Sequence, residues 1–293
     1  MSKVPRFILF ASAFLLGTAV SYAETVEPDL DRHPEWVKRA EYSMQWETDQ
    51  TPILYFETIH PIYQDPSKTN TYFMQPRISI QNRRGIYNFG VGYRRLLFDD
   101  NLLAGINTFY DNEHRHRHER VGVGVEAIGK RAEARFNSYF GVSRTYIVQE
   151  SPADTLFERA VDGVDFEVGT PIPFLPFAKI FHSGFWYDFK KSTKNMQGDQ
   201  WRLELKPSKH LTVDLETFND NKGEREYRGR VAMKFFFHSF SPRALLADLR
   251  VKKDPYRDVD LVERTLDFVE RSMTIQVEKW KDVGGVSVEV GRT

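Results

Sequence analysis

Hydrophobic and polar residues alternate one by one along most of the chain from residue 39 to residue 237. In RVGVGVEAIG, residues 120–129, three valines fall on one face of an extended chain, and two glycines and Glu126 fall on the other. The same period recurs in PRISIQN, NFGVGYRRLL, AEARFNSYF, WRLEL, LTVDLETF and YRGRVAMKFFF. This period indicates β-strands, because successive side chains of a strand point to opposite faces.

Turn-forming segments such as NRRG, FDDN, GKR, PIPFLP, PSKH and NDNKGERE divide this pattern into about twelve predicted strands. The predicted strands cover approximately 39–48, 53–62, 71–82, 86–97, 102–112, 120–128, 132–143, 160–170, 177–189, 198–206, 211–219 and 226–237.

Two all-β architectures accept such strands. In a soluble sandwich or small barrel the apolar face forms the core, whereas in an outer-membrane barrel it contacts lipid and the polar face lines the interior. The barrel is favoured because the strands are about ten residues long, as tilted membrane strands are. Short connections also alternate with longer ones at 113–118, 144–159 and 190–197, as expected for periplasmic turns and external loops; 63–70 is the exception. The sequence therefore predicts an all-β transmembrane antiparallel β-barrel.

Aromatic residues gather near the expected strand ends, as they do at the lipid–water boundaries of membrane barrels. We expect them to form two aromatic girdles. The groups are Tyr72 and Phe73; Phe109 and Tyr110; Phe185, Trp186 and Tyr187; and Phe235, Phe236 and Phe237.

The polar face of the predicted strands carries charges of both signs, and two interpretations remain open. Cross-strand ion pairs would fill and rigidify the barrel; alternatively, the same residues would line the water channel of a porin. About twelve strands is below the size at which wide channels are usual, which favours a filled barrel. The predicted lumen-lining residues are Arg77, Arg94, Glu126, Glu133, Arg135, Asp165, Glu167, Arg202, Glu204, Asp214, Glu216, Arg228, Arg230 and Lys234.

Residues 1–23 have the layout of a cleaved secretory signal peptide: basic Lys3 and Arg6, an apolar run, and small residues up to Ala23. A short periplasmic segment, 24–38, precedes the barrel, 39–240. The 41 basic and 41 acidic residues balance, so no nucleic-acid partner is expected. The chain has no Cys, which excludes disulfides and thiolate metal sites. We expect no cofactor and no metal.

The alternation ends near Phe240, and residues 241–293 form a different kind of segment. Ser241 as N-cap and Pro242 at the first helical position predict a short helix. An extended chain needs only about ten residues to cross about 30 Å of hydrocarbon. The tail is therefore long enough to enter or traverse the pore.

The combination of GYR, NTFYD, RVGVGVE and the late DLVER, within residues 39–280, resembles the β-domain of inverse autotransporters, the intimin and invasin group. The resemblance implies a twelve-stranded outer-membrane barrel, a helix near 243–251 and a pore linker near 259–280 that delivers an adhesive passenger. The linker would begin with Asp260, Leu261, Val262, Glu263 and Arg264. Only 13 residues follow Trp280, so we expect a barrel without its passenger.

The expected function is a surface or adhesion-related barrel or an export scaffold in the outer membrane, and not an enzyme. The alternative is a porin-like channel for small solutes. The expected partners are outer-membrane lipid and lipopolysaccharide, the barrel-assembly machinery, periplasmic chaperones, and a host or cell-surface ligand bound by the outer loops.

Three motifs suggest chemistry, and each has a simpler interpretation. HRHRHER spaces three histidines two apart, as a metal site would, but fits a polar loop tip, with Arg115, Arg117 and Arg120 suited to anionic lipopolysaccharide. Asp99 and Asp100 fall in a predicted turn. Ser183 and His182 are neighbours in a strand and therefore point to opposite faces, which prevents a catalytic pair.

Overall fold

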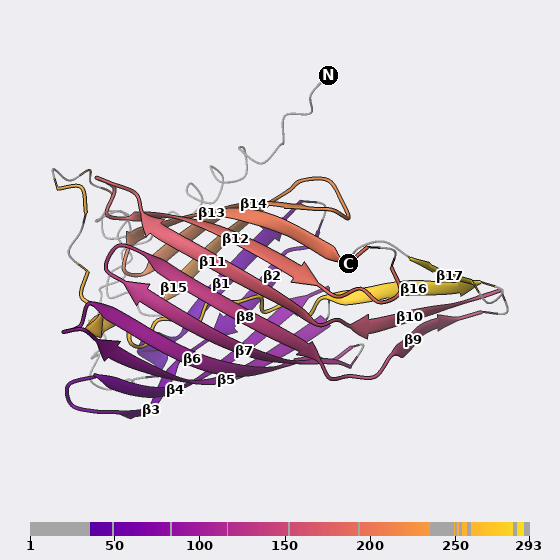
Figure 1. The fold of residues 1–293 in the computed structure, drawn as a ribbon, viewed down its shortest axis with the longest axis horizontal. Helices are drawn as coiled ribbons and strands as arrows, with labels where there is room; N and C mark the ends of the chain where they lie inside the picture. Colours follow the sequence, from indigo (N-terminus) through magenta and orange to yellow (C-terminus); the bar gives the residue numbers. More distant parts are fainter. Residues whose placement is uncertain are drawn as a thin grey trace, which may run out of the picture. The chain divides into compact units, whose positions relative to one another are not determined.

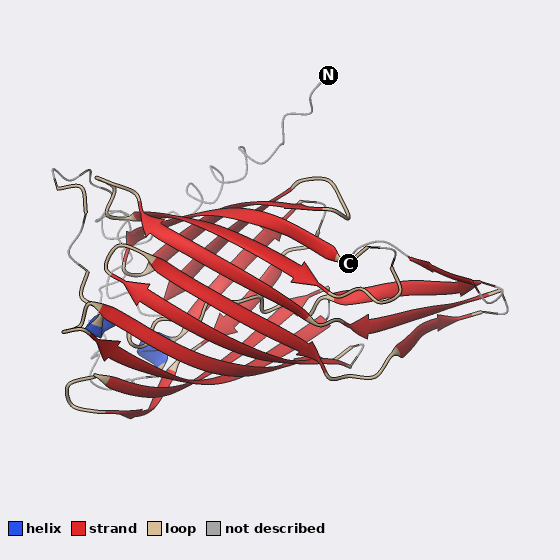
Figure 2. Ribbon diagram, viewed as in Figure 1, coloured by secondary structure: helices blue, strands red, loops and turns tan. Residues whose placement is uncertain are grey.

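The protein is described from a computed structural model (Figures 1 and 2), which covers residues 36–48, 50–82, 84–115, 117–151, 153–192, 194–234, 249, 251, 254–256, 259–283 and 286–289. The predicted signal peptide lies outside these residues. Among the residues described, no helix has the length and apolar character needed to span a membrane.

The main sheet closes on itself to form an antiparallel barrel. Its order is β2-β1-β15-β14-β13-β12-β11-β8-β7-β6-β5-β4-β3, and β2 also pairs with β4. Because β2 and β3 are two halves of one interrupted strand, the thirteen strands make a twelve-stranded ring. The predicted all-β antiparallel barrel is thus confirmed. The β2–β4 pairing closes the ring, and closure satisfies the backbone hydrogen bonds of the paired strand segments without water.

The strands of the barrel are β1 (Glu41–Glu47), β2 (Ile53–Glu57), β3 (His60–Gln64), β4 (Asn70–Gln81), β5 (Arg84–Leu97), β6 (Leu102–Glu113), β7 (His118–Gly129), β8 (Glu133–Gly141), β11 (Gly163–Pro171), β12 (Ala178–Tyr187), β13 (Met196–Ser208), β14 (Leu211–Asp220) and β15 (Glu226–Lys234).

One predicted strand, 53–62, is broken into β2 and β3. The break falls at Thr58 and Ile59, and the β3–β4 register shifts beside Pro61, which has no N–H to donate. The 3₁₀ turn η3 (Val37–Arg39) lies here, and Arg39 Nε donates to the Ile59 carbonyl at 3.0 Å.

The connections differ in length between the two ends of the barrel. One end carries the turns 65–69, 98–101, 130–132, 172–177 and 209–210, and is called the short-turn end. The other end, called the long-loop end, carries the 21-residue connection from β8 to β11 and the eight-residue connection from β12 to β13, together with connections of two to five residues. This asymmetry matches the predicted pattern of periplasmic turns and external loops.

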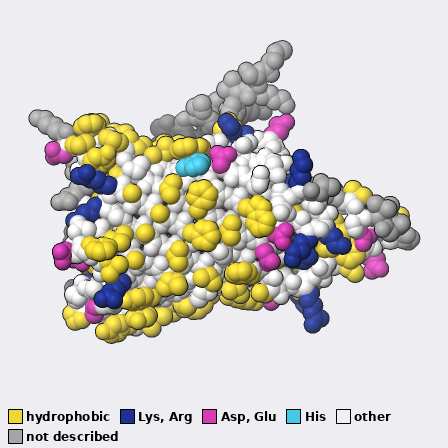
Figure 3. Space-filling view, viewed as in Figure 1, with side chains coloured by type: hydrophobic (Ala, Val, Ile, Leu, Met, Phe, Trp, Pro, Cys, Tyr) yellow, Lys and Arg dark blue, Asp and Glu magenta, His cyan; other side chains and the backbone are white. Residues whose placement is uncertain are grey.

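Apolar side chains cover the outside of the strands, and charged side chains gather toward the ends in the face shown (Figure 3). Val123 and Val125 are exposed, as predicted for a lipid-facing surface, whereas Gly122 and Gly124 face a crowded interior. A Cβ at Gly122 would lie 2.6 Å from Arg271 Nη2. The alternation read from the sequence therefore assigns the two faces of β7 correctly.

The prediction that whole aromatic groups form girdles was wrong. Tyr72 and Tyr110 are exposed, but Phe73, Phe109 and Tyr187 are buried inside the barrel. Adjacent residues of a strand face opposite sides, so only one member of each pair can reach lipid. The group at 235–237 lies outside the described residues.

A second sheet extends from the long-loop end, where the sequence predicted a loop at 144–159. The strands β9 (Tyr146–Glu150) and β10 (Asp154–Ala160) form a hairpin, and β16 (Val277–Val283) and β17 (Val286–Glu289) add to it in the order β17-β16-β10-β9 (Figure 1). The predicted linker to Trp280 thus becomes strand from Val277 onward. Pattern analysis missed this sheet because β16 pairs with a strand more than 110 residues away.

The described part of the tail contains one 3₁₀ turn, η4 (Val262–Arg264), and no α-helix. Of the predicted helix 243–251, only Leu249 and Val251 lie within the described residues.

Candidate functional site

Residues 259–276 contact inward-facing side chains along the barrel from one end to the other. Toward the short-turn end, Leu261 is fully buried in a cluster with Leu96, Leu103 and Ile128. Toward the long-loop end, Ile275 packs with Ala160. The polar lumen predicted from the sequence therefore also contains apolar positions where the tail packs.

A second apolar cluster lies between these points. Val269 and Met273 pack on Ile59, Phe73 and Phe109, all of which point inward from the wall. The rings of Phe73 and Phe109 belong to the groups that the sequence assigned to the girdles.

Two rows of polar wall residues hold the main chain of the tail. In the first row, Arg94 on β5 lies opposite Gly105 on β6, which in turn lies opposite Glu126 on β7. Arg94 Nε reaches across the glycine to Glu126 Oε1 at 2.5 Å, and both side chains are buried. Its Nη1 donates to the carbonyls of Thr265, at 3.1 Å, and Asp267, at 2.5 Å.

The second row, called the Asp111 row, consists of Asn88, Asp111 and Arg120, which lie directly opposite one another on β5, β6 and β7. Asn88 Nδ2 donates to Asp111 Oδ1 at 2.7 Å, and Arg120 Nε donates to Asp111 Oδ2 at 2.8 Å. Asp111 and Arg120 are completely buried. The carboxylate thus orients one amide and one guanidinium toward the lumen.

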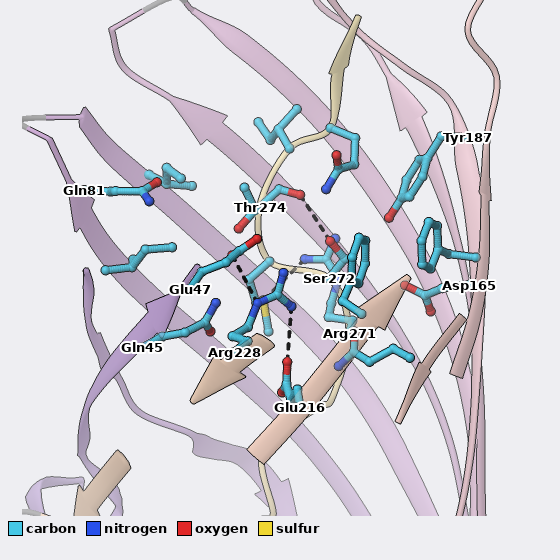
Figure 4. A pocket seen from close by; sticks show the side chains of 18 of the residues that line it. Gln45, Glu47, Gln81, Asp165, Tyr187, Glu216, Arg228, Arg271, Ser272 and Thr274 are labelled. Carbon is cyan, nitrogen blue, oxygen red and sulfur yellow. Dashed lines mark hydrogen bonds and ion pairs between the residues drawn. The ribbon is translucent and has the colours of Figure 1, made fainter. Parts of the chain in front are cut away.

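The Asp111 row holds three successive carbonyls of the tail. Arg120 donates to the carbonyls of Ser272, at 2.6 Å, and Thr274, at 3.0 Å, while Asn88 donates to that of Met273 at 3.0 Å. Figure 4 shows the tail passing through the interior here, with Ser272 and Thr274 between the walls.

Further wall groups accept from the tail's N–H groups. Val269 N donates to Gln75 Oε1, and Ser272 N donates to the Tyr139 hydroxyl, both at 2.9 Å. Arg271 contacts the wall through its side chain: its Nη1 and Nη2 lie 2.8 and 2.7 Å from the two oxygens of Asp111.

The predicted lumen-lining residues on the opposite wall form two groups of ion pairs, one across β8, β11, β13, β14 and β15 and the other across β14, β15 and β1. The pairs are Arg135 with Glu133 and Glu167, Arg202 with Glu167 and Asp214, Arg230 with Asp214, and Arg228 with Glu216 and Glu47.

The remaining predicted lumen-lining residues make other contacts, although Glu204 also lies 3.6 Å from Nη1 of Arg202. Arg77 pairs with Glu57 at 3.5 Å, Glu204 with Lys206 at 3.2 Å, Asp165 accepts from Tyr139 and Asn137, and Lys234 is exposed at the end of β15.

The predicted linker start forms η4. Val262 N donates to Asp260 Oδ1 at 2.9 Å, and Asp260 and Glu263 are exposed. Arg264 reaches the wall, with its Nη1 2.7 Å from Glu133 Oε1. Within the described part of 259–276, Arg264 and Arg271 are thus two tail residues that pair with buried wall carboxylates.

Sequence reasoning placed Arg120 in an outer loop facing lipopolysaccharide, and this was wrong. The HER segment belongs to β7, so His118 and Arg120 turn inward; His118 Nε2 lies 3.1 Å from Glu158 Oε2. Asp111 and Asn88 were missed altogether. The signal in the sequence that could have found them is the alternation of β6 and β5, which places both residues on the inward face.

The other chemical motifs are dispersed. Ser183 Oγ donates inward to Glu167, whereas His182 packs on Trp201 and Phe166 outside, as predicted. Asp99 lies in an exposed turn. Within the described residues, no group of three His, Cys, Asp or Glu side chains that could hold a metal is found.

The strand β16 connects the tail to two loops of the long-loop end. Trp280 stacks on Phe157 with the ring planes 13° apart. Glu278 pairs with Arg159 at 2.8 Å and accepts from the backbone N–H groups of Lys191 and Ser192. On the other face, a hydrogen bond from Lys281 holds the pKa of Asp154 below its ordinary value.

Two polar cavities lie beside the tail. One of about 610 Å³ lies toward the long-loop end and is lined by Gln45, Glu47, Gln81 and Thr274 among others (Figure 4). One of about 880 Å³ lies toward the short-turn end and is lined by residues including Lys130, Lys209 and Arg264.

A closed twelve-stranded ring that is apolar outside and charged inside defines an outer-membrane-type β-barrel, here with an extended segment in its lumen. The family model described as "Inverse autotransporter, beta-domain" matches residues 36–273. The chain belongs to this family of outer-membrane barrels, which confirms the resemblance read from the sequence.

Relatives and a solved structure agree with this assignment. The chain is 32% identical to a putative attaching and effacing protein homolog of Escherichia coli K12 over 41% of this chain and 39% of that protein. It is 31% identical to invasin of Yersinia enterocolitica over 38% and 13%. The matched regions thus span less than half the length of either relative. A membrane protein from work on in-meso crystallisation has the same fold, with a TM-score of 0.65 at 18% identity over 82% of this chain and 99% of that one.

Proposed function

We propose that this chain is the translocating unit of an inverse autotransporter and not an enzyme. Segment 259–276 is its pore linker, which enters at the short-turn end in the periplasm and leaves at the long-loop end outside the cell. The observation that carries this proposal is the series of contacts from Leu261, beside the short-turn end, to β16, beside the β9–β10 hairpin.

The part of this unit that is exposed outside the cell is the sheet at the long-loop end. Because β16 and β17 continue directly from the linker, whatever follows them is presented outside the membrane. An adhesion-related or export role is supported by the names of two relatives, an invasin and an attaching and effacing protein homolog. The expected partners of the outer loops are lipopolysaccharide and a host or cell-surface ligand. During assembly, the expected partners are the barrel-assembly machinery and periplasmic chaperones.

The orientation is tested by labelling single cysteines, which are specific because the chain has none. Ser287→Cys on β17 and Asp99→Cys in a short turn are both at exposed positions. We expect a membrane-impermeant maleimide to label the Ser287→Cys variant on intact cells, and the Asp99→Cys variant only after permeabilisation. Labelling of Ser287→Cys only after permeabilisation would contradict the proposal.

A channel for small solutes is the second candidate, and the two polar cavities favour it. It requires a continuous water path past the tail. Its test is the conductance of the full chain, compared with that of a chain from which the tail has been removed.

A further inference from the structure

Glu270 and Arg271 are neighbours of opposite charge in the tail, and their side chains lie toward opposite walls of the barrel. Arg271 faces the β5–β7 wall and binds both oxygens of Asp111. Glu270 lies on the other side and lines the same two cavities as Arg202 and Arg230. The two walls thus carry charges complementary to the two faces of this dipeptide.

The seat of Arg271 is built for a guanidinium. Its Cζ lies 4.5 Å from the ring centroid of Phe109 and 5.2 Å from that of Tyr139, which are cation–π distances. Gly122 leaves the space for Nη2, since a Cβ there would lie 2.6 Å from that atom. This glycine therefore serves the tail as well as the strand.

The polar contacts that the wall makes with the main chain of this segment have a different character. Arg94, Asn88 and Arg120 bind carbonyl oxygens, which every residue has. Because an extended chain repeats its backbone groups every two residues, a shift of two residues would offer the same wall groups new carbonyls. The charged dipeptide has no such replacement, since the residues two positions away are Phe268 with Val269 and Ser272 with Met273.

We propose that the lumen wall is a binding groove for an extended polypeptide backbone and that Glu270 and Arg271 set the register at which the chain stops in it. Backbone-directed contacts tolerate passage of other sequences, and the charged pair halts the chain. This proposal rests on the proposed pore-linker function and specifies how that linker is positioned.

The test uses the full chain and two disulfide reporters between β10 and β16. Leu156 lies opposite Lys281, so Leu156→Cys with Lys281→Cys reports the observed register. Leu156→Cys with Lys279→Cys reports a slip of two residues. Opposite Cβ atoms in antiparallel strands lie about 4.5–5.5 Å apart, close enough for a disulfide after small adjustments.

Each reporter is combined with Arg271→Gln, or with Arg95→Gln as a control that removes an exposed positive charge on the wall. Arg271→Gln leaves Asp111 with Arg120 and Asn88, so the barrel itself keeps its partners. We expect the ratio of in-register to slipped cross-link to fall about tenfold in Arg271→Gln, since a buried ion pair is lost. Arg95→Gln should leave the ratio unchanged, and Glu270→Gln should lower it as Arg271→Gln does.

The outcomes separate the two proposals. Loss of the in-register cross-link with gain of the slipped one supports the register role. An unchanged ratio in both Arg271→Gln and Glu270→Gln, or loss of the first cross-link without gain of the second, overturns it. Absence of both cross-links in the otherwise native chain would overturn the pore-linker function itself.

Discussion

Buried arginines are the residues on which the lumen depends. Arg94 and Arg120 are fully buried, and each obtains a carboxylate from the wall together with tail carbonyls. A buried charge without such partners costs several kcal/mol. For Arg94 the carboxylate lies two strands away, and it is reached only because Gly105 between them has no side chain.

Substituting Gly105 by Ala should therefore destabilise the barrel. The added Cβ would meet Glu126 Oε1 and force the ion pair apart, at a cost of about 1–3 kcal/mol. The measurement is the free energy of unfolding by urea in lipid. Gly229→Ala is the matched control, since its Cβ would have no neighbour nearer than 4.0 Å. Equal stability of the two variants would show that the Arg94–Glu126 ion pair does not require the absence of a side chain at Gly105.

The sequence identified the inward face of most strands but not the Asp111 row. Period two was sufficient for Arg94 and Glu126, because they lie inside long alternating runs. Asp111 and Arg120 flank EHRHRH, whose charges resemble a solvated loop. That these two residues lie opposite each other depends on the β6–β7 register, which the alternation alone does not fix.

At the scale of elements, β16 turns the end of the tail into part of a sheet. VEKWKDV alternates weakly, and its strand form depends on pairing with β10 and on burial of Trp280 against Phe157 and the loop at Lys191. Such partners are distant in sequence, which is why the sheet could not be predicted from local pattern. The break at Thr58 has the same kind of cause, since Pro61 marks it but its position depends on β4.

Truncating Trp280 should release this element. Trp280→Ala removes a buried ring and should weaken docking of β16 by about 3 kcal/mol. We expect faster trypsin cleavage at Lys279 and Lys281 in the folded protein, whereas Val288→Ala, at an exposed position, should cleave like the native chain. An unchanged cleavage pattern in Trp280→Ala would mean that the β10 ladder alone holds the strand.

At the scale of the whole barrel, the closed ring of strands and the tail inside it differ in how far the sequence predicts them. Alternation, strand length and the asymmetry of connections were enough to predict a closed membrane barrel, because lipid allows few other solutions for such strands. For the tail, the sequence showed only that it is long enough to cross the pore. Its actual course depends on apolar positions such as Phe73 and Leu103, which the sequence assigned to the girdle or to a strand end.

Removing the tail should open the barrel. The full chain in a planar bilayer is expected to show small or rare conductance, because residues 259–276 lie beside both cavities and occupy the lumen between them. A chain truncated after Asp258 lacks this segment and should give large steady currents. Equally large currents from both proteins would favour a solute channel.

The first and last strands of the barrel, β1 and β15, pair with each other from Glu41 opposite Lys234 onward, and this seam between them completes the cylinder. The polypeptide leaves the seam at the short-turn end, yet its final strands lie at the opposite mouth. Once the seam has zipped, the only remaining passage between those two points runs through the bore. A folded domain joined beyond Glu289 would be too bulky for this passage and would remain at the short-turn end. The tail therefore has to lie inside the barrel, or whatever follows it has to be still unfolded, when β1 pairs with β15.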